Sequence, residues 1–452
     1  MSDSNVKIEI HLIQNFAPSN LNRDDTGQPK SATFGGFRRA RISSQCAKRA
    51  VRAWWREHNT ATVGERTKRL QQLIFDKLAN DSEFTAKVPD AETKQAGIRV
   101  FTDAYYAASD SDKPYKTNVL IFIGPDEIGV CAQAIKDIWD EQAGDGKRVQ
   151  AGISTILKMP TPQRKKAGKK KTPKAQVVSQ EQLAPEQAGD EEAPQLKPRK
   201  EIQERIKAAQ LSADIALFGR MLAEQPGRNT DGACQMAHPI STHKIDMEMD
   251  FYTAVDDLKP EEETGAEMMG IVGFNSACYY RYALVDRDQL ARNLAGKTER
   301  TNGKWAKEIK LEDYQKADAV IRAFLEAMVY AVPTGKQHSF AAQNLPSFGL
   351  FVRRQGGVPI SLANAFAKPI RPSKDKDDLV GLSVDRLTKH WKALKKAYGD
   401  QGVLVTSCFQ IEQEDSLNEL GSSDKGSVEK AIRAVMEDGR GDEPAVHPSL
   451  QA

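Results

Sequence analysis

The chain has 452 residues, with 65 Lys or Arg against 62 Asp or Glu, a net charge of +3. This length supports a sizeable core in two or three domains. No apolar run is long enough for a spanning helix and the first residues do not form a signal sequence, so we expect a soluble, cytoplasmic protein that does not enter membranes. The five cysteines are scattered without a CxxC pair, so we expect no disulfide framework, metal or cofactor.

The first predicted element is a strand. Apolar residues from Val6 to Leu12 alternate with Lys7, Glu9 and His11, which is the period of a half-buried strand. We therefore expect His11 on the solvent face.

A basic segment, Asn22 to Arg56, follows the strand. It holds nine Lys or Arg and only two acids. Its second half predicts a helix that begins near Gln45 and is capped by Ser43 or Ser44. At 100° per residue the apolar and the cationic side chains separate onto two faces, so one face should pack and the other meet an anion. The cationic face contains Lys48, Arg49, Arg52 and Arg56, and the apolar face contains Ala47, Ala50, Val51, Trp54 and Trp55.

The first half of this segment predicts a loop. Gly27, Pro29 and the pair Gly35-Gly36 favour turns that bring backbone amides and the guanidiniums of Arg38, Arg39 and Arg41 close to a ligand. The alternative is a solvated basic face balanced by acids elsewhere. The scarcity of acids at helical spacing favours a polyanion, bound through phosphates without sequence information.

Residues 60–210 read as a mostly helical insertion, with amphipathic helices at 64–87 and 126–141 and a short buried strand at 118–123. Within it, residues 158–174 hold eight basic residues and no acid, whereas residues 181–192 hold five acids and no base. Six prolines punctuate these blocks, so we predict disorder over 160–199. The basic run could add nonspecific nucleic-acid affinity or only keep the loop extended, and the sequence leaves both open.

Order resumes at Ser212, which can cap a short helix that ends near Gly219. Met221 follows and is placed to leave the core. An exposed thioether can wedge between bases, although Met is more often a gap filler.

The next pattern predicts a long hairpin arm. Apolar residues alternate from Ile245 to Phe251, a returning strand runs from Ile271 to Leu284, and the connection is too polar for a tight turn. Phe251 and Tyr252 are adjacent, so they point to opposite faces and at least one should lie outside any single core. They are either core residues or stacking platforms for bases.

Downstream, residues 312–330 predict a helix, 348–352 a strand, and 360–370 a helix-like segment, before a polar tail. Strands and helices do not alternate evenly, so an α+β fold with an antiparallel sheet and insertions fits better than a doubly wound parallel sheet.

Catalysis is a minority hypothesis. Asp24 and Asp25 could hold a metal or act as acid and base, but adjacent acids seldom converge, and a phosphate-binding loop also needs acids to orient its arginines. Asp256 and Asp257 carry the same ambiguity. The sequence has no GK[ST] phosphate loop, HExxH or nucleophile elbow.

The string IHLIQNFAPSNLNRDDTGQPKSATFGGFRRARISSQCAKRAVR closely resembles the start of the backbone subunit of the type I-E CRISPR surveillance complex, Cascade (the CasC family). So do IALFGRM, AHPISTHKIDMEMDFYTAVDDL, CYYRYALVD and PTGKQHSFAAQN followed by ISLANAF. These blocks occur in the family's order and cover nearly all of the chain outside residues 60–205. The charged insertion at 160–199 is a departure from the family.

The resemblance implies an RRM-like (ferredoxin-like) antiparallel palm, an inserted helical finger domain and a β-hairpin thumb. We place palm at 1–59, finger at 60–210, palm at 211–234, thumb at 235–284, palm at 285–410 and tail at 411–452. Family contact positions match Arg23, Ser43, Gln45, Lys48, Arg49 and Arg52 here, to which the charge pattern adds Lys30, Arg38 and Arg41. The base-wedging methionine matches Met221 and the thumb aromatics match Phe251 and Tyr252, with Phe251 where the family can have tryptophan.

The resemblance further implies a crRNA-binding scaffold rather than an enzyme. Its partners would be crRNA, further copies of itself in a helical filament, target DNA through guide pairing, the large, small and repeat-end-binding Cascade subunits, and a recruited nuclease-helicase. The alternatives are a metal-dependent ribonuclease that uses Asp24 or Asp25, as in the type III backbone subunits, and an unspecialised single-strand binder.

Overall fold

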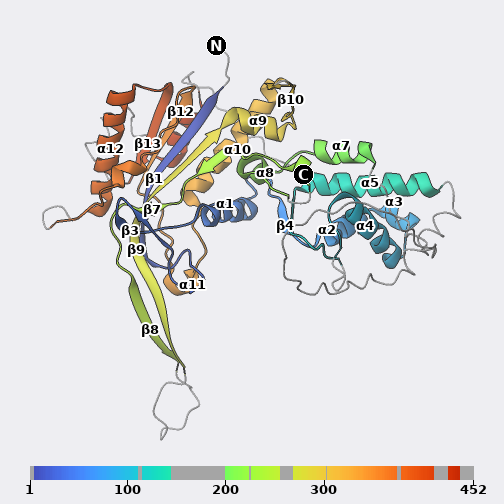
Figure 1. Ribbon diagram of the computed structural model, residues 1–452, viewed down its shortest axis with the longest axis horizontal. Helices are drawn as coiled ribbons and strands as arrows, with labels where there is room; N and C mark the ends of the chain where they lie inside the picture. Colours follow the sequence, from blue (N-terminus) through green and yellow to red (C-terminus); the bar gives the residue numbers. More distant parts are fainter. Residues whose placement is uncertain are drawn as a thin grey trace, which may run out of the picture. The chain divides into compact units, whose positions relative to one another are not determined.

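The computed structural model describes residues 5–109, 115–143, 199–222, 225–254, 268–301, 303–373, 378–411 and 426–437 (Figure 1). The chain forms two compact units. The first unit comprises Met1–Val63, Leu211–Arg220 and Thr230–Ala452, and the second comprises Gly64–Gln210 and Met221–Asn229. Among the residues described, no helix combines the length and apolarity needed to cross a bilayer.

The first unit is built on an antiparallel sheet with the strand order β13-β12-β1-β9-β6. The central strand β1 (Val6–Ser19) pairs with β12 (Phe348–Gln355) on one side and with β9 (Met268–Asp286) on the other. An antiparallel sheet combined with helices that are not interleaved strand by strand confirms the predicted α+β class.

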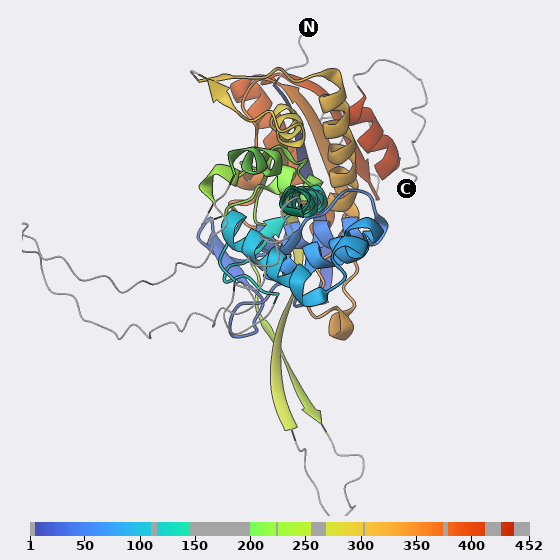
Figure 2. The same ribbon diagram turned by 90° about the vertical axis from the view of Figure 1, so that its right-hand side faces the viewer.

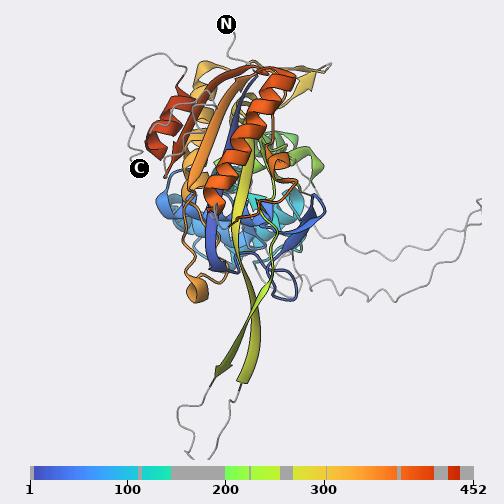
Figure 3. The same ribbon diagram turned by 90° about the vertical axis from the view of Figure 1, so that its left-hand side faces the viewer.

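Helices cover both faces of this sheet. On one face, α1 (Ser44–His58) and α10 (Leu311–Tyr330) pack their apolar stripes on alternate residues of β1, such as Ile8 and Ile10. On the other face, α12 (Leu379–Tyr398) packs on β12, as Figure 3 shows for the orange helix lying across the sheet.

The second covering layer contradicts the half-buried strand that the alternation predicted. Glu9 and His11 have no solvent exposure. His11 Nδ1 lies 2.9 Å from Tyr280 Oη, and Glu9 accepts hydrogen bonds from the guanidinium of Arg354 at 3.1 and 3.2 Å. Burial alone would raise the pKa of Glu9, but the hydrogen bonds and charges of His11 and Arg354 outweigh it and hold the pKa below 4.5. Polar residues on this face are buried because they are paired with each other.

A long hairpin extends from the sheet, as predicted. β8 (Glu248–Ala254) pairs antiparallel with the first half of β9, in a register that sets Phe251 opposite Ile271. Figure 2 shows these two strands extending beyond the other elements of the first unit. Residues 255–267, including Asp256 and Asp257, lie outside the described residues.

The C-terminal region also differs from the predicted polar tail. α13 (Val428–Met436) buries Ala431, Ile432 and Val435 in the main core of the first unit. The segment predicted as helix-like at 360–370 forms only a short 3-10 turn, η2 (Ala363–Phe366). The other elements of this unit are β2 (Ser31–Phe34), β3 (Phe37–Ala40), α8 (Ala213–Phe218), β6 (Cys234–Met236), β7 (Ile240–Ser241), α9 (Arg287–Leu294), β10 (Arg300–Thr301), β11 (Lys304–Trp305), α11 (Gln337–Phe340) and β13 (Val403–Gln410).

The second unit is mostly helical and has its own core, formed by residues such as Ile74, Ile98, Phe101 and Ile135. It begins at Gly64, and it includes Met221–Asn229, which the domain boundaries predicted from the sequence placed in the palm. Its elements are β4 (Glu65–Thr67), α2 (Leu70–Ala79), α3 (Ser82–Lys87), α4 (Ala91–Tyr105), β5 (Ile121–Ile123), α5 (Pro125–Ala143), α7 (Lys200–Ala208) and η1 (Pro226–Arg228).

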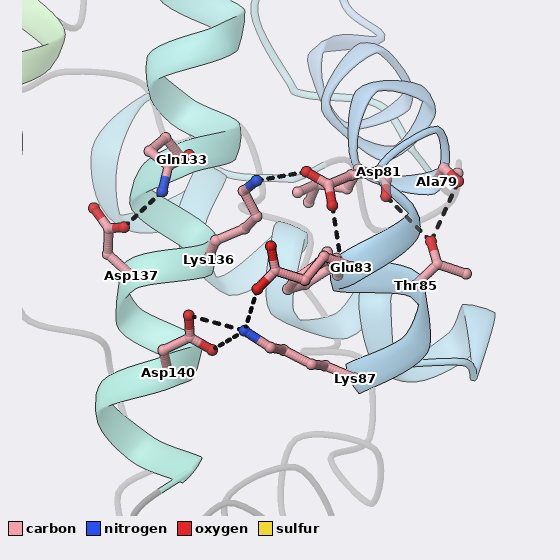
Figure 4. Close-up of polar contacts among 11 residues, drawn as sticks. Ala79, Asp81, Glu83, Thr85, Lys87, Gln133, Lys136, Asp137 and Asp140 are labelled. Carbon is pink, nitrogen blue, oxygen red and sulfur yellow. Dashed lines mark hydrogen bonds and ion pairs between the residues drawn. The ribbon is translucent and has the colours of Figure 1, made fainter.

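Ion pairs join the helices of the second unit. Between α3 and α5, Lys87 contacts Asp140 at 3.1 Å and Lys136 contacts Asp81 at 2.5 Å (Figure 4). α7 runs beside α5, where Arg205 pairs with Asp137.

Residue 199 marks where the described chain resumes after residues 144–198. The Arg199 amide donates to Tyr105 Oη at 2.9 Å, and its guanidinium pairs with Glu141. Arg199 therefore belongs to the ordered fold, whereas the rest of the predicted disordered stretch lies outside the described residues.

Candidate nucleic-acid interface

The loop after β1 is a small folded unit. Arg23 and Pro29 form an isolated antiparallel β-bridge, and the Lys30 amide donates to the Asn22 carbonyl at 2.8 Å. The Asn22 side chain accepts from the Ser43 amide at 2.8 Å. Asn22 therefore joins this loop to the start of α1, which brings the predicted contact residues Arg23, Lys30 and Ser43 together.

Asp24 organises the tip of this loop. Its Oδ1 accepts hydrogen bonds from the Thr26 amide, the Thr26 hydroxyl and the Gln28 amide at 2.7 to 3.0 Å. The hydroxyl bond of Thr26 is the main reason why the pKa of Asp24 lies below its ordinary value. In the described part of the chain no three His, Cys, Asp or Glu side chains gather as a metal site would require. The geometry of Asp24 accordingly fits a loop-forming residue.

The segment predicted as an arginine-bearing loop is a two-stranded hairpin, β2 and β3. Gly35 and Gly36 form its two-residue turn with φ of 60° and 82°, the conformation that favours glycine. Arg38 is exposed and Arg41 is half-buried.

The prediction that Arg39 faces a ligand is wrong. It is fully buried and donates to the carbonyls of Ser241 at 2.9 Å and Phe366 at 2.7 Å. Successive residues of a strand point to opposite faces, so Arg38 and Arg39 cannot share one role. Arg39 fixes the hairpin to the body of the first unit.

Helix α1 begins as predicted. Ser43 is its N-cap, and its hydroxyl accepts from the Cys46 amide at 3.2 Å. Gln45 and Arg49 are exposed and Lys48 is half-buried, with its ammonium 5.2 Å from the centre of the Phe218 ring. Burial raises the pKa of the Cys46 thiol, while the charges of Arg49 and Lys30 act to lower it.

The prediction that Arg52 lies on the ligand face of α1 is also wrong. Arg52 is buried, and its Nε lies 2.6 Å from Oδ2 of Asp214, which has no solvent exposure. Asp214 comes from α8, a partner that helical spacing cannot reveal. The charge of Arg52 is thus compensated inside the fold.

Sequence reasoning missed two neighbours of this surface. His238 Nδ1 accepts from the Ser44 amide at 3.0 Å at the start of α1. The turn before α11 approaches Leu21 so closely that a Cβ on Gly335 would lie 2.2 Å from the Leu21 carbonyl oxygen, which brings the half-buried Lys336 to the same region. The PTGK turn was visible in the sequence, but its proximity to the basic loop was not.

The hairpin of β8 and β9 displays both predicted aromatics. Phe251 is 61% exposed and Tyr252 is 42% exposed, on opposite faces of the ribbon. Neither is a core residue. Tyr252 lies over Gly270, where a Cβ would come within 2.4 Å of the ring, so one side of its ring is covered.

The base of this hairpin is attached to the basic loop. The Asn20 side chain donates to the carbonyls of Gly27 at 3.0 Å and Gly273 at 2.9 Å. Gln28 passes over Gly273 so closely that a Cβ there would lie 1.6 Å from its Oε1. Loop and hairpin are therefore one connected surface.

Met221 lies in the second unit and is 85% exposed. The residues described above belong to the first unit. The exposure of Met221 excludes the gap-filler alternative.

Six cations of this surface form no close ion pair among the described residues, although the charge of Lys30 contributes to the lowered pKa of Asp24. Within the described residues, six of the predicted cations have no carboxylate within 4.0 Å, although ion pairs are frequent elsewhere in the chain. A surface selected only for stability interleaves the two signs. The six are Arg23, Lys30, Arg38, Arg41, Lys48 and Arg49.

An α+β scaffold that presents cations without ion-pair partners from a loop, a hairpin and one helix, beside exposed aromatics on an arm, has the features typical of polyanion-binding proteins. More particularly, the chain belongs to the CT1975-like protein family, whose model matches residues 8–437. No curated protein matches it in sequence.

Two of the solved structures that resemble the chain come from RNA-guided complexes. One is a chain of a "CRISPR RNA-guided surveillance complex, pre-nicking", with 27% identity, a TM-score of 0.70, and coverage of 95% of this chain and 100% of that one. The other, from a "CRISPR RNA-guided surveillance complex", has 22% identity, a TM-score of 0.63, and coverage of 95% and 99%, and it supports the fold alone.

Proposed function

We propose that this protein is a guide-RNA-binding backbone subunit of a Cascade-type CRISPR surveillance complex, of type I-E. The observation that carries the proposal is the set of six cations without carboxylate partners on the connected surface of loop, hairpin and α1. Support comes from the family and from the RNA-guided complexes to which the similar chains belong. Phosphate groups would supply the missing negative charge.

In this proposal the first unit is an RRM-like palm. Its chain order is β1, α1, β6, β9, α10 and β12, and its sheet order is β6-β9-β1-β12, which corresponds to a β-α-β-β-α-β ferredoxin-like arrangement. The second unit is the finger and the hairpin of β8 and β9 is the thumb. Phe251 and Tyr252 stack on bases from the two faces of the thumb.

The protein binds the RNA backbone, whereas base pairing of the guide selects the target. The six cations, with Ser43 and Gln45, hold the sugar-phosphate strand without reading its sequence. Specificity comes from pairing of the guide with target DNA. Copies of the chain polymerise along one crRNA, beside the large, small and repeat-end-binding subunits, and a separate nuclease-helicase is recruited for cleavage.

Co-purification with RNA tests the proposal. The full chain, expressed with a guide RNA and the other subunits, should protect RNA fragments whose lengths rise in regular steps, one step for each added copy. A triple variant, Arg23→Gln, Lys30→Gln and Arg49→Gln, should lose RNA and assembly together. The matched control is Lys87→Gln, Lys389→Gln and Arg433→Gln, three cations each paired with an acid four residues earlier. Normal assembly without nucleic acid would refute the proposal.

The ribonuclease alternative has its own test. We expect no magnesium-dependent cleavage of labelled RNA by the assembled protein, because Asp24 is engaged by three hydrogen bonds within its loop. Cleavage that disappears in Asp24→Asn or Asp25→Asn would favour a metal-dependent nuclease instead.

A further inference from the structure

The hairpin of β8 and β9 joins the rest of the first unit over a short stretch of β9. Every residue of β8 is exposed, and Gly273 is the first buried residue of β9 when the strand is followed from Met268. Phe274 is the last residue of β9 that pairs with β8, and Asn275 is the first that pairs with β1. The direction in which the hairpin points therefore depends on the contacts around Gly273.

Asn20 makes the polar contacts at this root of the hairpin. Its side chain has no solvent exposure, and its amide nitrogen donates to the Gly27 carbonyl at 3.0 Å and to the Gly273 carbonyl at 2.9 Å. One planar amide thus joins the basic loop to β9. Gln28, from the same loop, lies so close to Gly273 that only a hydrogen atom fits in place of a side chain there.

Two oxygen atoms at this joint are unsatisfied. Oδ1 of Asn20 and Oε1 of Gln28 are buried, and neither has a hydrogen-bond partner among the described residues. A buried acceptor without a partner lowers the stability of the fold. Stability alone therefore does not account for two such side chains at one joint, which points to a role in function.

The basic loop keeps its own shape without Asn20. Asp24 accepts three hydrogen bonds from Thr26 and Gln28 inside the loop, and Asn22 joins the loop to α1. The root of the hairpin is also packed, because the ring centroids of Phe274 and Phe340 are 5.7 Å apart. Ring packing tolerates sliding, whereas two hydrogen bonds from one amide fix a direction. Loss of the Asn20 amide should therefore change the direction of the hairpin more than the shape of the loop.

We propose that Asn20 is a positioning residue. It fixes the hairpin against the basic loop so that Phe251 stacks on a base of the same RNA segment whose phosphates the loop binds. A ring stacks on a base only when the two planes are nearly parallel and in contact. Phe251 lies opposite Ile271, two residues beyond Gly273, so its ring moves with any change of angle at the root. This inference rests on the proposed function.

The test compares the affinity of the full chain for a mixed-sequence RNA with its affinity for a strand of the same length that lacks bases. Asn20→Ala should weaken RNA binding by about fivefold or more, because a stacking contact is lost. Binding to the abasic strand should stay unchanged, because the cations of the loop still meet phosphates. Phe251→Ala, added to Asn20→Ala, should cause no further loss, since the ring is already misplaced.

Asn293→Ala is the matched control. Asn293 is also buried, and its side-chain amide donates to the carbonyls of Ala216 at 2.7 Å and Asp231 at 2.8 Å. The control thus loses two bonds of the same kind elsewhere in the first unit. Both variants should have a lower melting temperature than the unaltered chain, but Asn293→Ala should keep the preference for RNA over the abasic strand.

The outcomes separate this inference from the function beneath it. If the unaltered protein binds neither strand, the proposed function fails. If it binds RNA, the positioning role is overturned when Asn20→Ala keeps the full preference, when it loses both strands equally, or when Phe251→Ala still causes its full loss in the Asn20→Ala background. If Asn20→Ala does not fold, Gln28→Ala replaces it, because that side chain is only half-buried. Gln28→Ala should also reduce the preference, and an unchanged preference would overturn the role.

Discussion

Charged side chains behave differently in two regions of this molecule. In the second unit, Lys87 meets Asp140 and Lys136 meets Asp81 (Figure 4), and Arg205 pairs with Asp137 on the neighbouring helix. On the basic surface of the first unit, equally charged residues such as Arg23 and Arg49 meet none among the described residues. Paired cations join helices and leave little field outside, whereas unpaired ones leave a positive potential that an external anion can satisfy. The presence or absence of a carboxylate partner, rather than the number of cations, therefore separates cations that join helices from cations that are available to an external anion.

Helix α1 carries both paired and unpaired cations, and replacing its paired cation by Arg52→Ala should have the largest effect on stability. It leaves Asp214 buried without its cation, so the free energy of unfolding should fall by about 3 to 5 kcal/mol. Denaturant unfolding of the full chain measures this. The folded fraction should bind RNA with unchanged affinity per molecule, and a stable variant that loses RNA would return Arg52 to the ligand face.

The buried ion pair between Glu9 and Arg354 should make the stability of the protein depend on pH. The pKa of Glu9 is lowered in the folded state, so its stabilisation is present above about pH 4.5 and is lost as the pH falls through the lower folded-state value. Glu9→Gln should be about 3 kcal/mol less stable than the unaltered chain at neutral pH. That difference should shrink below pH 4.5, as followed by urea unfolding at each pH, and a constant difference would show that the charge of Glu9 is not involved.

The third prediction concerns the exposed aromatic residues Phe251 and Tyr252 on the hairpin of β8 and β9. Phe251→Ala and Tyr252→Ala should each weaken RNA binding by about 1 to 3 kcal/mol because a stacking platform is removed. Melting temperatures should stay close to that of the unaltered chain, since both rings are exposed. A large loss of stability would assign these rings to packing instead.

The unpaired cations of α1 should change salt dependence more than stability. Replacing Lys48 and Arg49 by Gln should reduce the slope of log affinity against log salt by about 0.7 for each phosphate of single-stranded RNA that the variant no longer neutralises. All sequences should be affected equally. Titrations at four salt concentrations measure the slope, and an unchanged slope would remove these residues from the interface.

The smallest effect is expected at a compensated surface cation. Lys87→Gln removes an ammonium that pairs with Glu83 and Asp140, and exposed pairs contribute little to stability. We expect neither the melting temperature nor the RNA affinity to change measurably. A loss of RNA affinity would break the distinction between paired and unpaired cations.

The sequence by itself determined the local features of this protein. The cap at Ser43, the span of α10, the hairpin with its two aromatics, and the concentration of positive charge near the N-terminus all follow from periodicity, capping chemistry and composition, which act over a few residues. For the same reason the sequence singled out Arg23, Lys30, Lys48 and Arg49, whose contact with RNA stays a prediction.

Only the tertiary structure decided which charges are available. Arg52 is neutralised by Asp214, Arg39 donates to carbonyls more than 200 residues away, and Glu9 is buried against Arg354. Burial and pairing depend on which distant segments the fold brings together, and periodicity along the chain does not contain that information.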